Sequence, residues 1–317
     1  MTAAEEGHSG GTPHTSGPVS AEAARLMKLA TSASVAVALV LVGVKAFAWI
    51  TTDSVALLSS LVDSALDVAA SVLNLLAVRH ALMPADREHR FGHGKAEALA
   101  GLGQSAFIAG SALFLIVEAS RRLMAPTPVE DGLIGFVVMG VSIAATLGLV
   151  VFQRRVIRMT NSVAISADSL HFTSDLLVNA GVIVALVLST RFGLALADPL
   201  IALAIAAYIL WGAWEVANSS YDILMDREFL DADRARVREV VMAHAEVRDM
   251  HDLRTRTSGN MSFIQLHLEL DGAMTLRRAH EIADQVEASV RAAFPGAEVL
   301  IHQDPDGVDE ARAAFRR

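Results

Sequence analysis

Residues 54–78 read SVALLSSLVDSALDVAASVLNLLAV, an apolar run that carries Asp63 and Asp67 in its middle. About 20 helical residues cross the ~30 Å hydrocarbon core of a bilayer, so this run predicts a membrane-spanning helix. A carboxylate at the centre of such a helix costs roughly 2.5–3.5 kcal/mol on insertion scales. Two carboxylates in one span therefore indicate a polar site within the membrane.

Five further runs have the length and composition of membrane spans. The chain of 317 residues is 53% hydrophobic and only 19% charged, against roughly 25% charged residues in globular proteins. The five runs are Leu29–Ile50, Ala98–Leu123, Leu133–Phe152, Val163–Thr190 and Pro199–Ala217. Residues 29–217 are expected to form a six-helix transmembrane domain in a lipid bilayer. The polar leader at residues 1–28 is expected to be disordered.

The composition also excludes several classes of protein. The chain contains no cysteine, which excludes disulfide scaffolds, thiolate zinc sites and iron–sulfur clusters. Its formal net charge of −9 argues against nucleic acid as a partner, because a duplex binder needs a basic face. Any bound metal is therefore expected on His, Asp, Glu or backbone oxygen.

The basic residues near the span ends are unevenly distributed, which predicts the orientation of the chain. The side that holds both termini has Arg25, Lys28, Arg79, Arg87, Arg90, Lys95, Arg154, Arg155 and Arg158. The opposite side has Arg121, Arg122 and Arg191. Since Lys and Arg are enriched in cytoplasmic connections, both termini are expected in the cytoplasm.

The pattern after residue 217 is that of a soluble domain, expected over residues 218–305 and followed by a tail at 306–317. The expected elements, in the order helix, strand, strand, helix, strand, are Asp231–Ala243, Met250–Arg256, Ser262–Leu270, Leu276–Phe294 and Val299–His302. In the second strand, Ile264 is expected to be out of phase with the other large apolar residues. The predicted fold class is an α-helical membrane protein with a C-terminal ferredoxin-like α+β domain.

An offset of 108 residues (162 − 54) relates the start of the second span to that of the fifth. At this offset Asp63 falls on His171 and Asp67 falls on Asp175, and each pair is spaced i, i+4 on one helix face. The two spans run in opposite directions, so side chains roughly 14–20 Å from opposite surfaces meet near the midplane. Three carboxylates and one imidazole are expected to converge there, a set that suits tetrahedral Zn²⁺.

These carboxylates also allow two simpler interpretations. They either line a water-filled polar cavity or pair with arginines inside the bundle, although no arginine falls in the cores of the spans. Lys45, near the outer end of its span, is interpreted as snorkelling to the interface beside Trp49. Asp168, one turn before His171, either orients the imidazole or faces water.

Two histidine-rich segments lie outside the spans. Asp86, His89 and His93 have the spacing D-x2-H-x3-H, which allows three ligands to close on one ion. The soluble domain carries a second set, namely His251, His267, His280, His302 and Asp304. These residues converge only if the sheet brings them together. His80 and His244 lack such companions and are interpreted as structural.

Five motifs together resemble the cation diffusion facilitator family, and in particular its bacterial zinc- and iron-associated branch. The motifs are LVDSALD at 61–67, FGHGKAE at 91–97, HFTSD at 171–175, HDLRTR at 251–256 and HQDP at 302–305. The resemblance implies divalent-cation export across the cell inner membrane in exchange for protons, by a homodimer. It implies a secondary transporter and no enzyme, with Zn²⁺ as the principal ion and Cd²⁺ or Fe²⁺ also compatible with the ligands.

The resemblance further implies roles for individual residues. It assigns a transport site to Asp63, Asp67, His171 and Asp175, and a loop site to Asp86, His89 and His93. It assigns a regulatory two-metal site in the cytoplasmic domain to His251, His267, His280, His302 and Asp304, with Gln303 nearby. It also implies that Lys95 pairs with Asp226 and so joins the two domains.

The alternative hypothesis is a membrane-anchored metal sensor in which the intramembrane site is structural. A sensor needs an output domain or a partner surface, and the sequence shows neither. A channel is disfavoured, because a closed four-ligand site binds too tightly for fast conduction.

Overall fold

The computed structural model describes residues 20–53, 55–124, 133–194, 196–259 and 261–308. These residues form two compact units, divided between Met225 and Asp226, and each unit is described by itself. Residues 1–19 of the predicted leader and 309–317 of the predicted tail lie outside the described residues.

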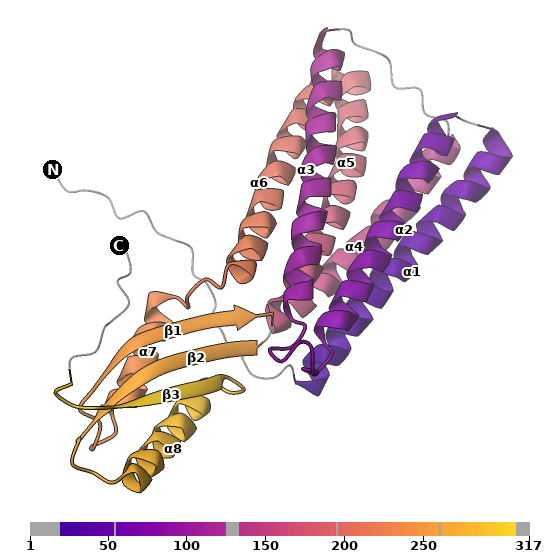
Figure 1. The fold of residues 1–317 in the computed structure, drawn as a ribbon. Helices are drawn as coiled ribbons and strands as arrows, with labels where there is room; N and C mark the ends of the chain where they lie inside the picture. The colour runs from indigo at the N-terminus through magenta and orange to yellow at the C-terminus, as the bar shows by residue number, and fades with distance from the viewer. Residues whose placement is uncertain (1–19, 54, 125–132, 195, 260, 309–317) are drawn as a thin grey trace, which may run out of the picture. The chain divides into compact units, whose positions relative to one another are not determined.

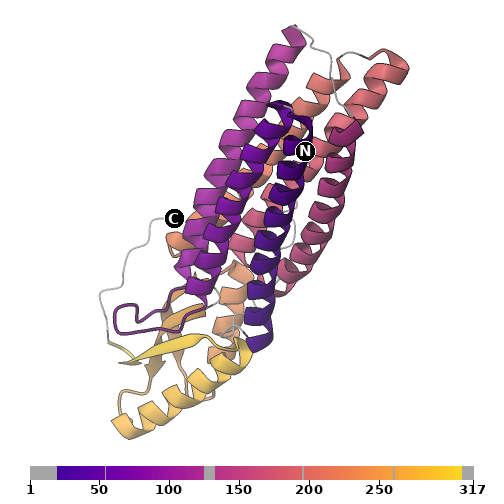
Figure 2. The same ribbon diagram turned by 90° about the vertical axis from the view of Figure 1, so that its right-hand side faces the viewer.

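The first unit is a bundle of six long helices that run alongside one another (Figures 1 and 2). The helices are α1 (Ala21–Thr52), α2 (Val55–Ala81), α3 (Lys95–Met124), α4 (Leu133–Thr160), α5 (Val163–Phe192) and α6 (Ala197–Leu224). All six are long and apolar enough to cross a membrane, which confirms the six predicted spans. The helices extend past most of the predicted bounds, because a helix continues beyond the stretch that apolar composition marks.

Two helix starts are fixed by serine caps. The Ser20 hydroxyl accepts a hydrogen bond from the Ala23 amide, so residues 21–28, predicted as part of a disordered leader, are helical. The Ser162 hydroxyl caps α5 by accepting from the Ile165 amide and donates to the buried Glu97 carboxylate of α3 at 2.5 Å. This contact fixes where α5 begins, and so the height of every side chain on it.

Close approach between helices depends on small residues, as is usual in membrane bundles. A Cβ at Gly101 of α3 would lie 2.7 Å from the Ser220 hydroxyl of α6 and 2.9 Å from a Val163 methyl of α5. The α5 helix is the central one, because it packs against all five of the other helices, α1, α2, α3, α4 and α6. Side chains on α5 can therefore meet partners from several helices.

The second unit is the predicted α+β domain. Its elements are α7 (Asp231–Met242), β1 (Asp249–Ser258), β2 (Met261–Leu270), α8 (Leu276–Ala293) and β3 (Glu298–Pro305) (Figure 1). The sheet order is β1-β2-β3, with β1 antiparallel and β3 parallel to the central strand β2. The predicted order of elements is confirmed.

The structure contradicts the prediction of which residue in β2 is out of phase with the core-facing side chains. Ile264 is fully buried and shares the core face with Leu266, Leu268 and Leu270, where both helices contribute apolar side chains. Phe263 is the residue out of phase, and the Arg256 guanidinium covers its ring at 4.4 Å. The opposite face of β2 therefore carries the remaining odd-numbered positions, among them His267.

Candidate metal sites

Three of the four predicted transport-site residues meet inside the helix bundle. His171 Nε2 of α5 lies 3.0 Å from Asp67 Oδ1 of α2 and 3.9 Å from Asp175 Oδ2, one turn along α5. The three potential ligand atoms all lie within 4.8 Å of one another. We call Asp67, His171 and Asp175 the bundle cluster. Asp63 is exposed, and among the described residues it is not part of this group.

The bundle cluster sits in a largely apolar setting. His171 is 6% exposed, and the rings of Phe107 and Phe172 contact its imidazole at centroid distances of 6.1 and 5.5 Å. Carboxylates held this way in a membrane helix are unfavourable unless a cation or protons compensate them. Two oxygens and a nitrogen that converge within coordination range fit a divalent metal ion such as Zn²⁺.

Asp168 does not face water, so that expectation is wrong, and its described hydrogen bonds go to side chains other than the His171 imidazole. Its carboxylate is completely buried and accepts hydrogen bonds from Ser34 at 2.5 Å and Gln153 at 2.7 Å, with Gln104 at 3.4 Å. These contacts join α5 to α1, α3 and α4 one turn before His171.

Lys45 does not snorkel, contrary to the sequence interpretation. Its ammonium donates to the Ser64 hydroxyl of α2 at 2.6 Å and to the Ser60 carbonyl at 3.3 Å. Hydrogen-bond acceptors on the neighbouring helix hold the charge inside the bundle, so the interface is not needed to satisfy it.

The loop between α2 and α3 brings its three predicted ligands together, and we call Asp86, His89 and His93 the loop cluster. Asp86 lies 3.4 Å from His89 Nδ1 and 3.3 Å from His93 Nε2. Hydrogen bonds from the backbone amides of His89 and Glu88 hold the pKa of the Asp86 carboxyl below its usual range. The Asp86 carboxylate is therefore ionised at neutral pH and available to bind a cation.

The sequence interpretation missed a neighbour of the loop cluster. The His80 ring, on the last turn of α2, contacts the His93 ring at a centroid distance of 4.6 Å. His80 lies just after the predicted end of the second span at residue 78 and only six residues before Asp86 (86 − 80). This position next to the loop was the signal in the sequence that could have identified His80 as a neighbour of the cluster.

The second unit places a third cluster across its three strands. His251, His267 and His302 are in register on β1, β2 and β3. All three contact the Asp304 carboxylate, which is 5% exposed, at 3.4, 2.7 and 3.0 Å respectively. We call these four residues the sheet cluster. Of these four residues, His251, His267 and Asp304 place one potential ligand atom each within 4.8 Å of one another, which fits a metal site, while the His302 side chain is 62% exposed.

Two further observations concern the sheet cluster. Glu269 Oε1 lies 2.9 Å from His251 Nδ1, a partner that the sequence interpretation missed because register decides it. The predicted ligand His280 is not brought to the cluster. It lies on α8, its side chain is 69% exposed, and its nearest acid is Asp284 at 3.6 Å.

The predicted pair of Lys95 and Asp226 spans the two units, so it stays a prediction. Within the first unit, the Lys95 ammonium donates to the Leu224 carbonyl at 3.3 Å. Within the second, the Asp226 carboxylate accepts from the Arg256 guanidinium at 3.3 Å.

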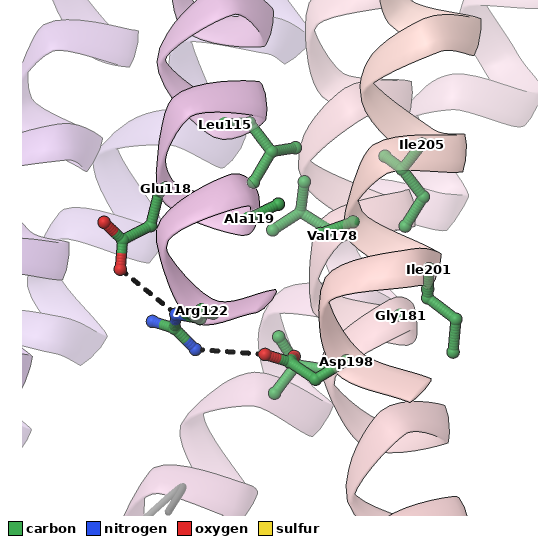
Figure 3. Close-up of a pocket in the computed structure, with 11 residues that line it drawn as sticks. Leu115, Glu118, Ala119, Arg122, Val178, Gly181, Asp198, Ile201 and Ile205 are labelled. Carbon is green, nitrogen blue, oxygen red and sulfur yellow. Dashed lines mark hydrogen bonds and ion pairs between the residues drawn. The ribbon is translucent and has the colours of Figure 1, made fainter. Parts of the chain in front are cut away.

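A pocket between α3, α5 and α6 carries a further group of charges. Figure 3 shows Arg122 between Glu118 and Asp198, with contacts of 3.1 and 3.2 Å, beside apolar residues such as Leu115 and Ile201. Because its charges are paired with one another, this pocket fits a structural contact between the ends of α3 and α6.

Comparison with known proteins gives one consistent result. Residues 32–225 match the model of the cation efflux transmembrane domain, and residues 230–306 match that of the cation efflux protein cytoplasmic domain. The chain is 50% identical over 282 residues to a cation-efflux pump FieF of Pectobacterium atrosepticum, covering 89% of this chain and 94% of that protein. It is 48% identical over 283 residues to FieF of Shewanella oneidensis, covering 89% of this chain and 95% of that protein.

Among solved structures, one of CzrB, described as a candidate zinc transporter, is 31% identical to this chain. The match covers 25% of this chain and 99% of the solved one. Its TM-score of 0.24 is too low for the superposition to add to the sequence match.

Proposed function

Because this chain belongs to the cation efflux family, we propose that it exports Zn²⁺ from the cytoplasm in exchange for protons. The chain is a multi-pass membrane protein related to efflux pumps over nearly its whole length. The proposal adds the ion, the coupling, a homodimeric state, and an inner-membrane location with both termini in the cytoplasm. The matched dimer-type cytoplasmic domain supports the homodimeric state, and the basic span ends support the cytoplasmic location of both termini.

One observation carries the proposal, namely the convergence of Asp67, His171 and Asp175 between two membrane helices. Imidazole and carboxylate together suit Zn²⁺ better than hard ions, which prefer oxygen alone. Asp63 lies one turn before Asp67 on the same helix face, so we propose that it joins as the fourth ligand when metal binds.

The same ligand set can couple metal to protons. Its members must be deprotonated to bind metal, so protons arriving from the opposite side compete with Zn²⁺ for His171 and the carboxylates. We propose that the metal-loaded and proton-loaded forms face opposite sides of the membrane in turn.

Zinc uptake into proteoliposomes that contain a trapped zinc indicator tests the proposal. Uptake should rise when the lumen is more acidic than the bath and fall when a protonophore collapses the gradient. Uptake that ignores the proton gradient would exclude antiport. No uptake at all by correctly inserted protein would favour the membrane-anchored sensor.

We further propose that the loop and sheet clusters bind regulatory metal. His302→Ala is expected to lower zinc uptake at low zinc concentration about three- to tenfold without abolishing it, because the sheet cluster loses one imidazole and the transport helices keep theirs. His244→Ala is the matched control, since His244 contacts Gln285 and lies outside the cluster. Equal uptake curves for both variants would remove the sheet cluster from regulation.

A further inference from the structure

Lys45 brings a positive charge into the bundle, against the helix that carries Asp67. It lies in α1, yet its ammonium donates to two residues of α2, Ser60 and Ser64. Ser64 is 1% exposed, so the ammonium end of Lys45 is held against a buried side chain of α2. An ionisable group inside a membrane helix is costly, and its partners indicate what it serves.

The turn that holds Lys45 is the turn that carries the metal ligands. Ser64 follows Asp63 directly and precedes Asp67 by three residues, so Ser64 and Asp67 share a helix face. Ser60 precedes Asp63 by three residues and Asp67 by seven, so both hydrogen-bond partners of Lys45 lie on the helix face that carries the two aspartates. The ammonium therefore contacts, from a third helix, the face of α2 that carries two of the proposed ligands.

Lys45 is suited to act on the site by charge alone. A protonated amine has three donors and no lone pair, so it cannot coordinate a metal ion. The hydrogen bonds to Ser64 and Ser60 end on a hydroxyl and a carbonyl, and these leave the three carboxylates of the proposed site available to metal.

The charge balance of the site indicates how the Lys45 ammonium affects metal binding. Three carboxylates and one Zn²⁺ sum to −1 with a neutral imidazole, and the Lys45 ammonium brings the sum to zero. Without metal the same groups carry −3, so the ammonium is attracted more strongly to the empty site than to the loaded site at −1. It therefore stabilises the empty site more than the loaded one, which lowers the affinity of the site for Zn²⁺.

We propose that Lys45 is a positioning residue that acts as a fixed counter-charge, lowering the zinc affinity of the transport site without coordinating the metal. The inference rests on the proposed function, because the site on which Lys45 acts is the proposed transport site. It predicts that removal of the charge strengthens zinc binding and slows zinc release. Damage to the structure of the site would instead weaken zinc binding.

The test compares Lys45→Met and Lys45→Gln with Lys45→Arg. The Met variant removes the charge and the hydrogen bond, the Gln variant keeps a donor for Ser64 without the charge, and the Arg variant keeps the charge. Zinc binding is measured by calorimetry on the full chain in a background of Asp86→Ala and Asp304→Ala, which removes the loop and sheet clusters. The zinc KM for uptake is measured in parallel in the chain without the background changes.

The Met and Gln variants should bind zinc on the order of tenfold more tightly, with a lower KM and a lower maximal rate. The Arg variant should stay within about twofold of the parent in both measurements. Unchanged or weaker binding in both neutral variants would overturn the inference. Absence of uptake by the parent chain would contradict the proposed function, while calorimetry would still decide the role of Lys45.

Discussion

Asp175→Ala is expected to reduce zinc transport at least ~100-fold while the protein still inserts and folds. The substitution removes one of the three side chains that converge in the bundle cluster, and a single outer-shell partner of a metal site already contributes 10–100-fold. Folding should survive, because the change removes a carboxylate whose ionised form is costly in a membrane helix. Initial rates of zinc uptake in proteoliposomes measure the effect.

Glu118→Gln is the matched control for Asp175→Ala. It also removes a carboxylate from a membrane helix, but Glu118 contacts Arg122 and lies outside the three clusters. Its uptake rate should stay within a few-fold of the parent, because exposed or partly exposed ion pairs contribute little. Undiminished uptake by a folded Asp175→Ala protein would refute the assignment of the transport site.

His171→Asp is expected to change which metal the protein prefers. His171 provides the single nitrogen ligand of the proposed site, and imidazole favours Zn²⁺ over hard cations. Four carboxylates form an all-oxygen set, which is better matched to Mn²⁺. The Mn²⁺:Zn²⁺ transport ratio should therefore rise on the order of tenfold, and the pH profile of uptake should lose the step that the imidazole contributes.

Competitive uptake of both metals at several pH values measures this change. His302→Asp makes the same substitution in the sheet cluster and should leave the transport ratio as it is, since we do not place His302 on the transport path. A His171→Asp protein with the parental metal ratio and pH profile would show that His171 is not a ligand of the transported ion.

Most of the fold was predictable, because it depends on patterns that act along the chain. Apolar runs long enough to cross a bilayer predicted all six helices, and periodicity with turn signals predicted the five elements of the C-terminal domain in order. The internal offset of 108 residues aligned Asp63 with His171 and Asp67 with Asp175, and predicted that all four would meet. The structure brings Asp67 and His171 to 3.0 Å and leaves Asp63 exposed.

The features that were not predictable concern contacts between segments far apart in sequence. Nothing near Lys45 indicates that its ammonium reaches α2, because the hydropathy of α1 is the same whichever way the side chain points. Phe263 and Ile264 are adjacent and both apolar, so strand register and the covering guanidinium of Arg256 decide which one enters the core. Glu269 was missed because its contact with His251 also depends on strand register.

An anomalous-scattering map at the zinc absorption edge, from crystals of the full chain grown with Zn²⁺, tests the transport site most directly. We expect a peak between α2 and α5, about 2.0–2.2 Å from ligand atoms of Asp67, His171 and Asp175, with Asp63 turned inward as the fourth ligand. Zinc peaks confined to the loop and sheet clusters, with none in the bundle, would contradict it.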